Sequence, residues 1–220
     1  MLKRYLCTLL LLQSTVFAAF AQSATPANEQ DETPAPFIGS EIIFGHGLLP
    51  LHQMFAGFLQ YVDYSNTTAS GAISLTYRYH LSRVVSLGVT GVLERETGQW
   101  QTHQGILTGI FDPYDIAYGR FSRSTFTVAP EVTFNYGETA HGMLRFYSVV
   151  ALGITRSAQT TTLDNPGSEY SITPPPASTK VYTTFQATPI GIRVGRALGG
   201  FAELGIGYKG IFNYGLTYRF

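Results

Sequence analysis

The chain has 220 residues, with 14 Lys and Arg against 14 Asp and Glu, 45% hydrophobic residues and 13% charged residues. The charged share is about half that of an ordinary soluble domain, and 14% aromatic residues together with 23 glycines favour sheet over helix. Zero net charge excludes the basic footprint of a nucleic-acid-binding protein, and a single cysteine excludes a disulfide scaffold or a cysteine-based metal cluster.

The first 21 residues have the organisation of a secretory signal peptide. Lys3 and Arg4 precede an apolar run over 6–12, and small residues around 19–21 form an A-x-A-like cleavage site. A transmembrane anchor is the alternative, but it needs about 20 consecutive apolar residues, and polar residues interrupt this run. We therefore expect an exported protein.

Residues 22–36 carry several prolines and acidic side chains and almost nothing apolar, which predicts a disordered leader. The folded domain is expected to span 37–220. No later segment is apolar for long enough to form a membrane-spanning helix.

Most of this domain alternates apolar and polar residues with a period of two, which indicates β-strands. The alternation is clearest at the end of the chain, where one face carries Phe212, Tyr214, Leu216, Tyr218 and Phe220. Eight strands are predicted in this way, at 37–46, 73–79, 85–94, 126–136, 144–154, 180–195, 202–208 and 212–220.

The connections between these strands alternate between short and long. Short ones are expected at 80–84, 137–141 and 196–200, and long ones, rich in Gly, Pro, Ser and Thr, at about 47–70, 97–122 and 157–179. The last connection, 209–210, is short. This layout predicts an all-β fold, an eight-stranded antiparallel up-and-down barrel with tight turns at one rim and large loops at the other.

The two faces of the predicted strands indicate which solvent each meets. One face is large, apolar and free of charge, whereas the other carries Gly, Ala, Ser, Thr and scattered ions. A soluble ligand-carrying barrel would turn its apolar face inward and a charged face outward. A barrel in a membrane suits both faces: lipid surrounds the apolar face, and the polar face lines the interior. Closure of the barrel pairs every backbone group, as a bilayer requires. We therefore expect a transmembrane barrel, with a soluble carrier as the alternative.

Charged residues on the polar strand face are predicted to point into the barrel: Glu41, Arg78, Glu94, Glu131, Arg145, Arg193, Glu203 and Arg219. A three-residue turn between Arg196 and Gly200 would place Arg193 opposite Glu203. An eight-stranded barrel has interior room only for side chains. We interpret these ions as a structural network that plugs a non-conducting barrel, rather than as a pore lining or an active site.

Two prolines lie inside predicted strands, where a closed barrel offers no free edge for a residue without an N–H group. At Pro189 the alternation also changes parity, and a bulge near Thr188 and Pro189 explains both features. No such bulge is evident at Pro130, in the strand at 126–136.

Three features point to one family: the signal peptide, the alternating run over 71–96, and the final hairpin over 201–220 with Phe220 at its end. On these residues the chain resembles the small OmpA/OmpX-like outer-membrane β-barrels of Gram-negative bacteria. The resemblance implies a monomer in the cell outer membrane, reached through the periplasm and inserted by the barrel-assembly machinery. The assembly signal read by that machinery would be Phe212, Tyr214, Leu216, Tyr218 and Phe220.

The sequence offers little catalytic chemistry, with neither a G-x-S-x-G nor an H-E-x-x-H motif. Glycines at 205, 207 and 210 match G-x-G-x-x-G, but they lie in a β-hairpin and not between a strand and a helix. We expect no cofactor, no metal and no nucleic-acid partner. The alternative is a lipid-modifying enzyme, of the lipid A deacylase or acyltransferase type, that uses a rim His near a Ser. Its candidate residues are His46, His52, His103, Ser65, Ser70, Ser122 and Ser124.

The resulting hypothesis is an integral outer-membrane protein that is not an enzyme. Its rigid barrel would present three long outer loops for envelope integrity or surface interaction, because functional variation concentrates in loops on a fixed scaffold. Outer-membrane lipid and lipopolysaccharide are the expected partners.

Overall fold

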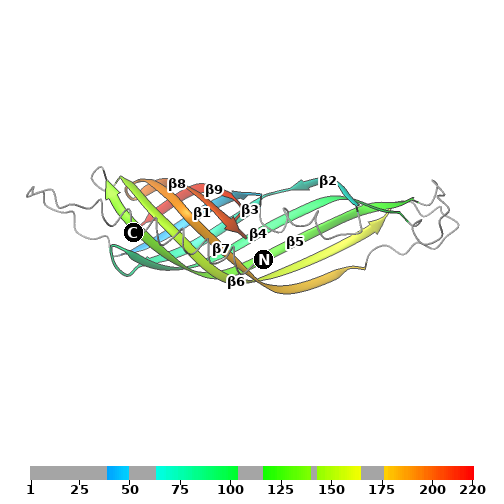
Figure 1. The fold of residues 1–220 in the computed structure, drawn as a ribbon, viewed down its shortest axis with the longest axis horizontal. Coiled ribbons are helices and arrows are strands. Elements are labelled where there is room, and N and C mark those ends of the chain that lie inside the picture. The colour runs from blue at the N-terminus through cyan, green and yellow to red at the C-terminus, as the bar shows by residue number, and fades with distance from the viewer. Residues whose placement is uncertain (1–38, 50–62, 104–115, 140–142, 165–175) are drawn as a thin grey trace, which may run out of the picture.

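The computed structural model describes residues 39–49, 63–103, 116–139, 143–164 and 176–220. These residues form nine strands and no helix: β1 (Ser40–Leu48), β2 (Asp63–Ala69), β3 (Ala72–His80), β4 (Val85–His103), β5 (Ile116–Thr139), β6 (Leu144–Leu163), β7 (Ser178–Gly195), β8 (Leu198–Gly207) and β9 (Phe212–Arg219). Eight of them close into an antiparallel barrel in the order β4-β3-β1-β9-β8-β7-β6-β5, with β5 returning to β4 (Figure 1). The expected all-β, eight-stranded barrel is confirmed. The segments expected to be signal peptide and leader lie outside the described residues.

The first and last strands of the barrel close it. β1 pairs with β3 on one side and with β9 on the other, so that Glu41 lies opposite both Arg78 and Arg219. The final residue continues the ladder, since Ser40 and Phe220 exchange two backbone hydrogen bonds of 2.9 Å each. Closure therefore leaves neither β1 nor β9 as a free edge in the barrel.

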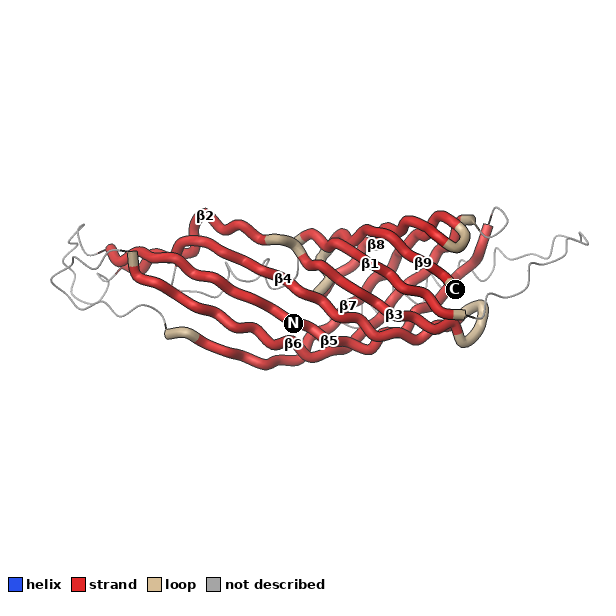
Figure 2. The backbone as a smooth tube through the Cα atoms, turned by 180° about the vertical axis from the view of Figure 1, so that it is seen from behind, coloured by secondary structure: helices blue, strands red, loops and turns tan. Residues whose placement is uncertain are grey.

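Four barrel strands, β4 to β7, continue well past the other strands and form a projecting sheet together with β2. β2 pairs with the outer part of β4, where Tyr64 lies opposite Trp100. Figure 2 shows these long strands running on beyond the ends of β1, β8 and β9. The barrel is thus asymmetric, with tight connections at one end and a sheet at the other.

Much of what the sequence predicts as long loops is therefore strand. The antiparallel ladder runs through the expected loops at 97–122 and 157–179, with Thr97 opposite Ser122 and Ser122 opposite Thr160. A period of two is recognised by contrast between apolar and polar residues, and that contrast is lost where both faces are polar. Threonine nevertheless favours strands. Residues 50–62, 104–115 and 165–175 of these connections lie outside the described residues.

The two strand prolines are accommodated differently. The register of β7 shifts around Thr188 and Pro189 against both of its neighbours, which confirms the predicted bulge. β5 runs straight through Pro130, which lies opposite Val89 and faces outward. Its register with β6 is the same on both sides of Pro130, so Pro130 itself needs no bulge; the register of β5 against β6 shifts further on, between Asn135 and Gly137.

The predicted register of the β7–β8 hairpin is wrong. Gly195 lies opposite Gly199, and consequently Gly191 rather than Arg193 lies opposite Glu203. The turn begins earlier than expected because Gly195 itself takes the left-handed conformation, with φ of +121°. Arg193 stays inside the barrel and donates hydrogen bonds to carbonyl oxygens of this turn.

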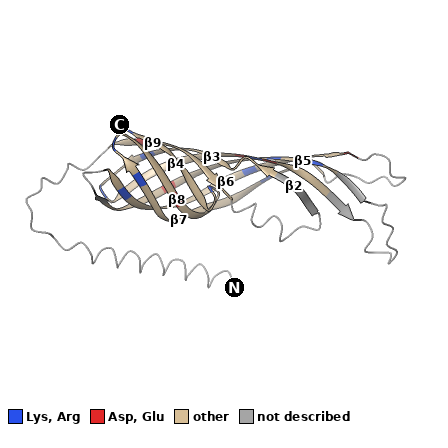
Figure 3. Cartoon of the chain, turned by 90° about the horizontal axis from the view of Figure 1, so that it is seen from above, with Lys and Arg blue, Asp and Glu red and all other residues tan. Residues whose placement is uncertain are grey.

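The two faces of the barrel differ in polarity as the sequence predicts. Large apolar side chains face outward and are exposed, among them Leu87, Val89, Leu152, Leu204 and Leu216. Threonines, serines and ions face inward and are buried, and Figure 3 shows charged residues along the barrel strands. This arrangement is the reverse of a soluble domain, whose apolar residues are mostly inside.

The turn between β8 and β9 folds into the mouth of the barrel. Tyr208 and Lys209 are both buried, and the Lys209 backbone N–H donates to the side chain of Gln186, at 2.9 Å. Tyr208 lies in a small apolar cluster with residues from four strands, Ala72, Val92, Ala129 and Ala151. These small side chains leave room for the tyrosine ring, which closes the lumen at this level.

Replacing Gly210 in this turn by alanine should destabilise the barrel. Gly210 has φ of +97°, and an added Cβ would lie 2.1 Å from the carbonyl oxygen of Leu48. The left-handed conformation alone costs an L-residue about 1–2 kcal/mol, so we expect at least that loss. Urea unfolding followed by the fluorescence of Trp100, the single tryptophan, measures it.

Gly200→Ala is the matched control, because the nearest atom to its added Cβ is 3.7 Å away. Equal stabilities of the two variants would contradict the described conformation of the turn.

Candidate functional site

The interior of the barrel contains all eight charged residues that the sequence assigns to it. Each of these side chains is buried: Glu41, Arg78, Glu94, Glu131, Arg145, Arg193, Glu203 and Arg219. His80 and Lys209 are also buried, as are Glu96, Tyr147 and Tyr208. Lys209 was not foreseen because its position in a short turn suggested an exposed side chain.

Glu41 is the centre of the cluster nearest the tight turns. Its carboxylate accepts hydrogen bonds from Nε of Arg193, at 2.9 Å, and from Nε of Arg219, at 3.1 Å. The Thr217 hydroxyl donates to the same oxygen, Oε1, and Arg78 Nη1 lies 3.6 Å from the other oxygen, Oε2. Arg78 and Arg219 flank Glu41 through strand register, whereas Arg193 reaches it across the lumen from β7.

Glu131 is the centre of a second cluster, deeper in the barrel. It accepts hydrogen bonds from Arg78 Nη2 and Lys209 Nζ, both at 2.8 Å, and from the Thr90 hydroxyl at 2.7 Å. Arg78 therefore links the two clusters. Gly88 lies between Arg78 and Glu131 on the intervening strand, and an added Cβ there would lie 3.1 Å from Cγ of Glu131. The glycine leaves space for this ion pair to cross β4.

Glu203 has neutral partners rather than the predicted Arg193. The Tyr147 hydroxyl donates to it at 3.0 Å and the Asn213 amide at 2.8 Å. Gly191 separates Tyr147 from Glu203, and its missing side chain makes room for the Tyr147 ring, which would lie 2.5 Å from an added Cβ. The guanidinium of Arg78 lies over the Tyr147 ring, 5.4 Å from its centre.

These clusters fill the lumen at the level they occupy. The cavity among Glu41, Arg78, Arg145 and Arg193 measures about 10 Å³, which is at the lower limit for a single water molecule. Within the described part of the barrel, side chains thus take the place of a water-filled channel here.

A Ser–His–Glu arrangement lies beside the first cluster. The Ser86 hydroxyl lies 2.7 Å from Nδ1 of His80, and Nε2 of His80 lies 3.4 Å from Glu41. Such an order of groups can activate a serine nucleophile, but Ser86 and His80 are 0% and 1% exposed. Asn135 also donates to the Ser86 hydroxyl. Because both side chains are buried, we interpret this arrangement as one that orients buried polar groups.

Of the rim residues of the enzyme alternative, His46 and Ser70 lie in the described part of the chain and have other neighbours. His46 faces outward, with its ring centre 5.8 Å from that of Tyr214, and the Ser70 hydroxyl is engaged with backbone atoms of Gly71 and Arg95. His52 and the side chains of Ser65 and His103 lie outside what the structure describes.

The residues of the expected assembly signal lie on the outward face of the last strand. All five are exposed: Phe212, Tyr214, Leu216, Tyr218 and Phe220. Phe212 stacks on Tyr214 and Tyr218 on Phe220, with ring centres 5.6 and 5.9 Å apart. They form an apolar stripe beside β1, with a stacked aromatic pair on either side of Leu216.

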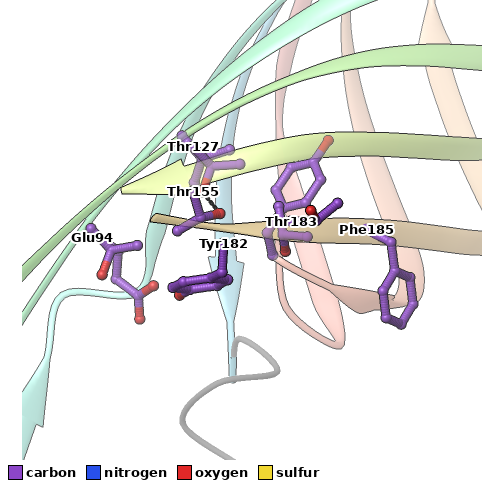
Figure 4. Close-up of a pocket in the computed structure, with 10 residues that line it drawn as sticks. Glu94, Thr127, Thr155, Tyr182, Thr183 and Phe185 are labelled. Carbon is purple, nitrogen blue, oxygen red and sulfur yellow. Dashed lines mark hydrogen bonds between the residues drawn. The ribbon is translucent and has the colours of Figure 1, made fainter. Parts of the chain in front are cut away.

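Above Tyr208 the lumen opens into a second space, which we call the cup. It is a cavity of about 210 Å³ towards the projecting sheet, and Figure 4 shows Glu94 and Tyr182 side by side at it. Its lining is Val92, Glu94, Thr125, Thr127, Thr155, Tyr182, Thr183, Thr184, Phe185 and Tyr208. Sequence reasoning placed Glu94 in the lumen but could not find the cup, because its floor depends on the inward turn.

Among the described residues, no group of His, Cys, Asp and Glu side chains is arranged to hold a metal ion. The described part of the chain also contains no helix of sufficient length and apolar character to cross a membrane. No protein-family model matches the sequence, and no curated protein matches it. The physical properties of the barrel must therefore support any functional conclusion.

Replacing Glu131 by glutamine should destabilise the barrel by about 3–5 kcal/mol, because the buried Lys209 loses the carboxylate it pairs with and Arg78 loses the nearer of its two. Adding Lys209→Met should recover part of that loss, since one of the stranded charges is then removed. Urea unfolding of both variants measures the two effects.

Asp164→Asn is the control. It breaks the ion pair with Arg120, whose side chain is 72% exposed, and we expect a loss of less than about 1 kcal/mol. A loss for Glu131→Gln as small as this would show that the interior ions do not stabilise the fold as described.

Proposed function

We propose that the chain is an integral outer-membrane β-barrel protein whose interior is plugged and does not conduct. The observation that carries the proposal is the reversed polarity of a closed barrel, with exposed Leu, Val, Ile, Phe and Tyr side chains outside and paired ions inside. In water such an exterior would be a large unprotected apolar surface. In a bilayer it is the surface that lipid requires, and the ladder leaves no barrel strand unpaired.

The two ends of the barrel suggest its orientation. Barrels of this class have short turns on the periplasmic side and longer segments outside. By this rule the projecting sheet of β2 and β4–β7 extends from the cell surface. The expected signal peptide over 1–21 and the outward apolar and aromatic residues of β9 support the same location and insertion by the barrel-assembly machinery.

The projecting sheet is the part we assign to envelope integrity or surface interaction. Its outward face is polar, with Thr97, Ser122 and Thr160 in neighbouring strands. It also carries the Arg120–Asp164 pair at 2.8 Å, in which the hydrogen bond and charge of Asp164 raise the pKa of Arg120. A polar sheet on a rigid mount suits contact with lipopolysaccharide or another surface molecule, and requires neither a second copy nor a catalytic group.

A membrane-spanning role predicts that charge is tolerated differently along β6. Leu152 is 64% exposed on the barrel wall, and an arginine there should lower the free energy of unfolding of the protein in lipid vesicles by about 2–4 kcal/mol. Thr160→Arg, on the same outward face but in the projecting sheet, should change it by about 0.5 kcal/mol or less. Heat-modifiable gel migration after refolding into vesicles measures both.

Equal tolerance of the two arginines, or recovery of the native protein in the soluble periplasmic fraction, would contradict the membrane location.

The non-conducting interior is tested separately. The purified protein in planar bilayers should show no sizeable single-channel conductance, and lipid A incubated with it should remain intact.

A further inference from the structure

Two arginines lie where the apolar wall of the barrel ends and the projecting sheet begins. On β4 the outward side chains are apolar as far as Leu93, which is 57% exposed, and Arg95 is the next outward residue. On β6 they are apolar as far as Ile154, which is 62% exposed, and Arg156 follows it. Both arginines are exposed. Each is therefore the first outward residue beyond the apolar wall on its own strand.

The strand register brings these two arginines together around β5. Arg95 lies opposite Ser124, and Arg156 lies opposite Phe126, the neighbouring outward residue of the same strand. Two strand spacings of about 4.8 Å and a rise of about 3.4 Å per residue then separate the Cα atoms of Arg95 and Arg156 by about 12 Å. The two long side chains thus flank the Ser124 hydroxyl, and all three groups can reach one anion between them.

The charges of these two guanidinium groups are not balanced by neighbouring acids. Arg120, further out on the same face, is paired with Asp164 at 2.8 Å. In the described ranges of the chain, no ion pair joins Arg95 or Arg156 to a carboxylate. A guanidinium group matches the geometry of a phosphate with two parallel hydrogen bonds. The pair of arginines therefore offers a positively charged site that suits a phosphate.

The position of the pair on the barrel indicates where such a phosphate comes from. On one side of it the wall is apolar, and on the other side the sheet is polar. With the wall in a bilayer, this boundary lies at the level of the lipid headgroups. Arginine side chains at that level extend toward the headgroups and attract anionic lipids. In the orientation given above, the headgroups are those of the outer leaflet.

A groove beyond Arg95 favours a lipid whose phosphate is attached to a sugar. The groove has a volume of about 390 Å³, and four residues with hydroxyl groups line it: Thr97, Ser122, Thr160 and Thr162. Three of these are exposed, so the groove is an open surface rather than an enclosed pocket. The hydroxyls of Thr160 and Thr162 donate to backbone carbonyls, which leaves their oxygens to accept hydrogen bonds from a saccharide.

We propose that Arg95, Ser124 and Arg156 bind the phosphate of a phosphorylated glycolipid, and that the groove holds its sugar. Lipid A, the glycolipid of lipopolysaccharide, has this chemistry. This site rests on the proposed function, because it needs the barrel wall to lie in a membrane. It deepens that function by assigning a lipid class to particular residues.

The test uses the full chain in micelles of an uncharged detergent, with diphosphoryl lipid A as the probe and native mass spectrometry of the complex as the readout. Arg95→Gln and Arg156→Gln should each weaken lipid A binding about fivefold, and the double variant at least about tenfold. Arg196→Gln is the matched control, since Arg196 is exposed in the tight turn at the other end of the barrel. It should leave binding within about twofold.

Three further ligands test the phosphate, the sugar and the lipid separately, and none of them needs a variant to fold. Lipid A without its phosphates should bind the unaltered protein at least about tenfold more weakly, because both guanidinium groups lose their partner. Phosphatidylglycerol, which has a phosphate but no sugar, should also bind more weakly than lipid A. Inorganic phosphate should displace lipid A no better than chloride at the same ionic strength.

Several results would overturn the proposal. They are a lack of lipid A binding by the folded protein, unchanged binding by the folded double variant, or an equal loss for Arg196→Gln. Equal binding of phosphatidylglycerol, or displacement by inorganic phosphate, would do the same. Heat-modifiable migration shows that each variant is folded. The membrane location is decided by Leu152→Arg and Thr160→Arg in vesicles, so failure of the lipid site alone would leave that location standing.

Discussion

The pairing of Arg78 with both Glu41 and Glu131 is the interaction on which the interior depends. Closure of eight strands forces every second side chain into a narrow lumen, where an unpaired charge would be severely destabilising. Arg78 joins the cluster at the tight turns, where Arg193 and Arg219 meet Glu41, to the deeper cluster, where Lys209 meets Glu131. Because residue 88 is a glycine, no side chain stands between Arg78 and Glu131 where their ion pair crosses β4. The network, the inward turn and the cup are therefore successive levels of one lumen.

The sequence predicts the barrel well wherever apolar and polar residues contrast. The strand around Leu87 and Val89 and the last strand are recognisable because one face is apolar and the other is not. The same rule identified the inward positions, since parity alone decides which residues share the lumen. It could not identify the projecting sheet, because both faces of that sheet are polar. Thr97 and Ser122, which lie opposite each other in neighbouring strands, are an example.

Partners inside the lumen were harder to predict than positions, because they depend on register and on contacts across the barrel. A turn that begins at Gly195 instead of Arg196 moved Arg193 away from Glu203, and nothing local signals that it instead reaches Glu41 on a distant strand. The same applies to Lys209: a two-residue connection gives no indication that it turns inward.

The ion pairs of the lumen have a consequence for how the barrel assembles. Lys209 and Glu131 are 78 residues apart in sequence, and Glu41 and Arg193 are 152 apart, so neither pair can form through local folding. The Glu41–Arg193 pair joins β1 to β7, so it forms only once β1 has met β9, and long-range contacts of this kind slow folding. A slip of one residue where β1 meets β9 would turn Glu41 to the outer face, away from its arginine partners. The Glu41 cluster is therefore buried and paired only when β1 closes the barrel in the correct register.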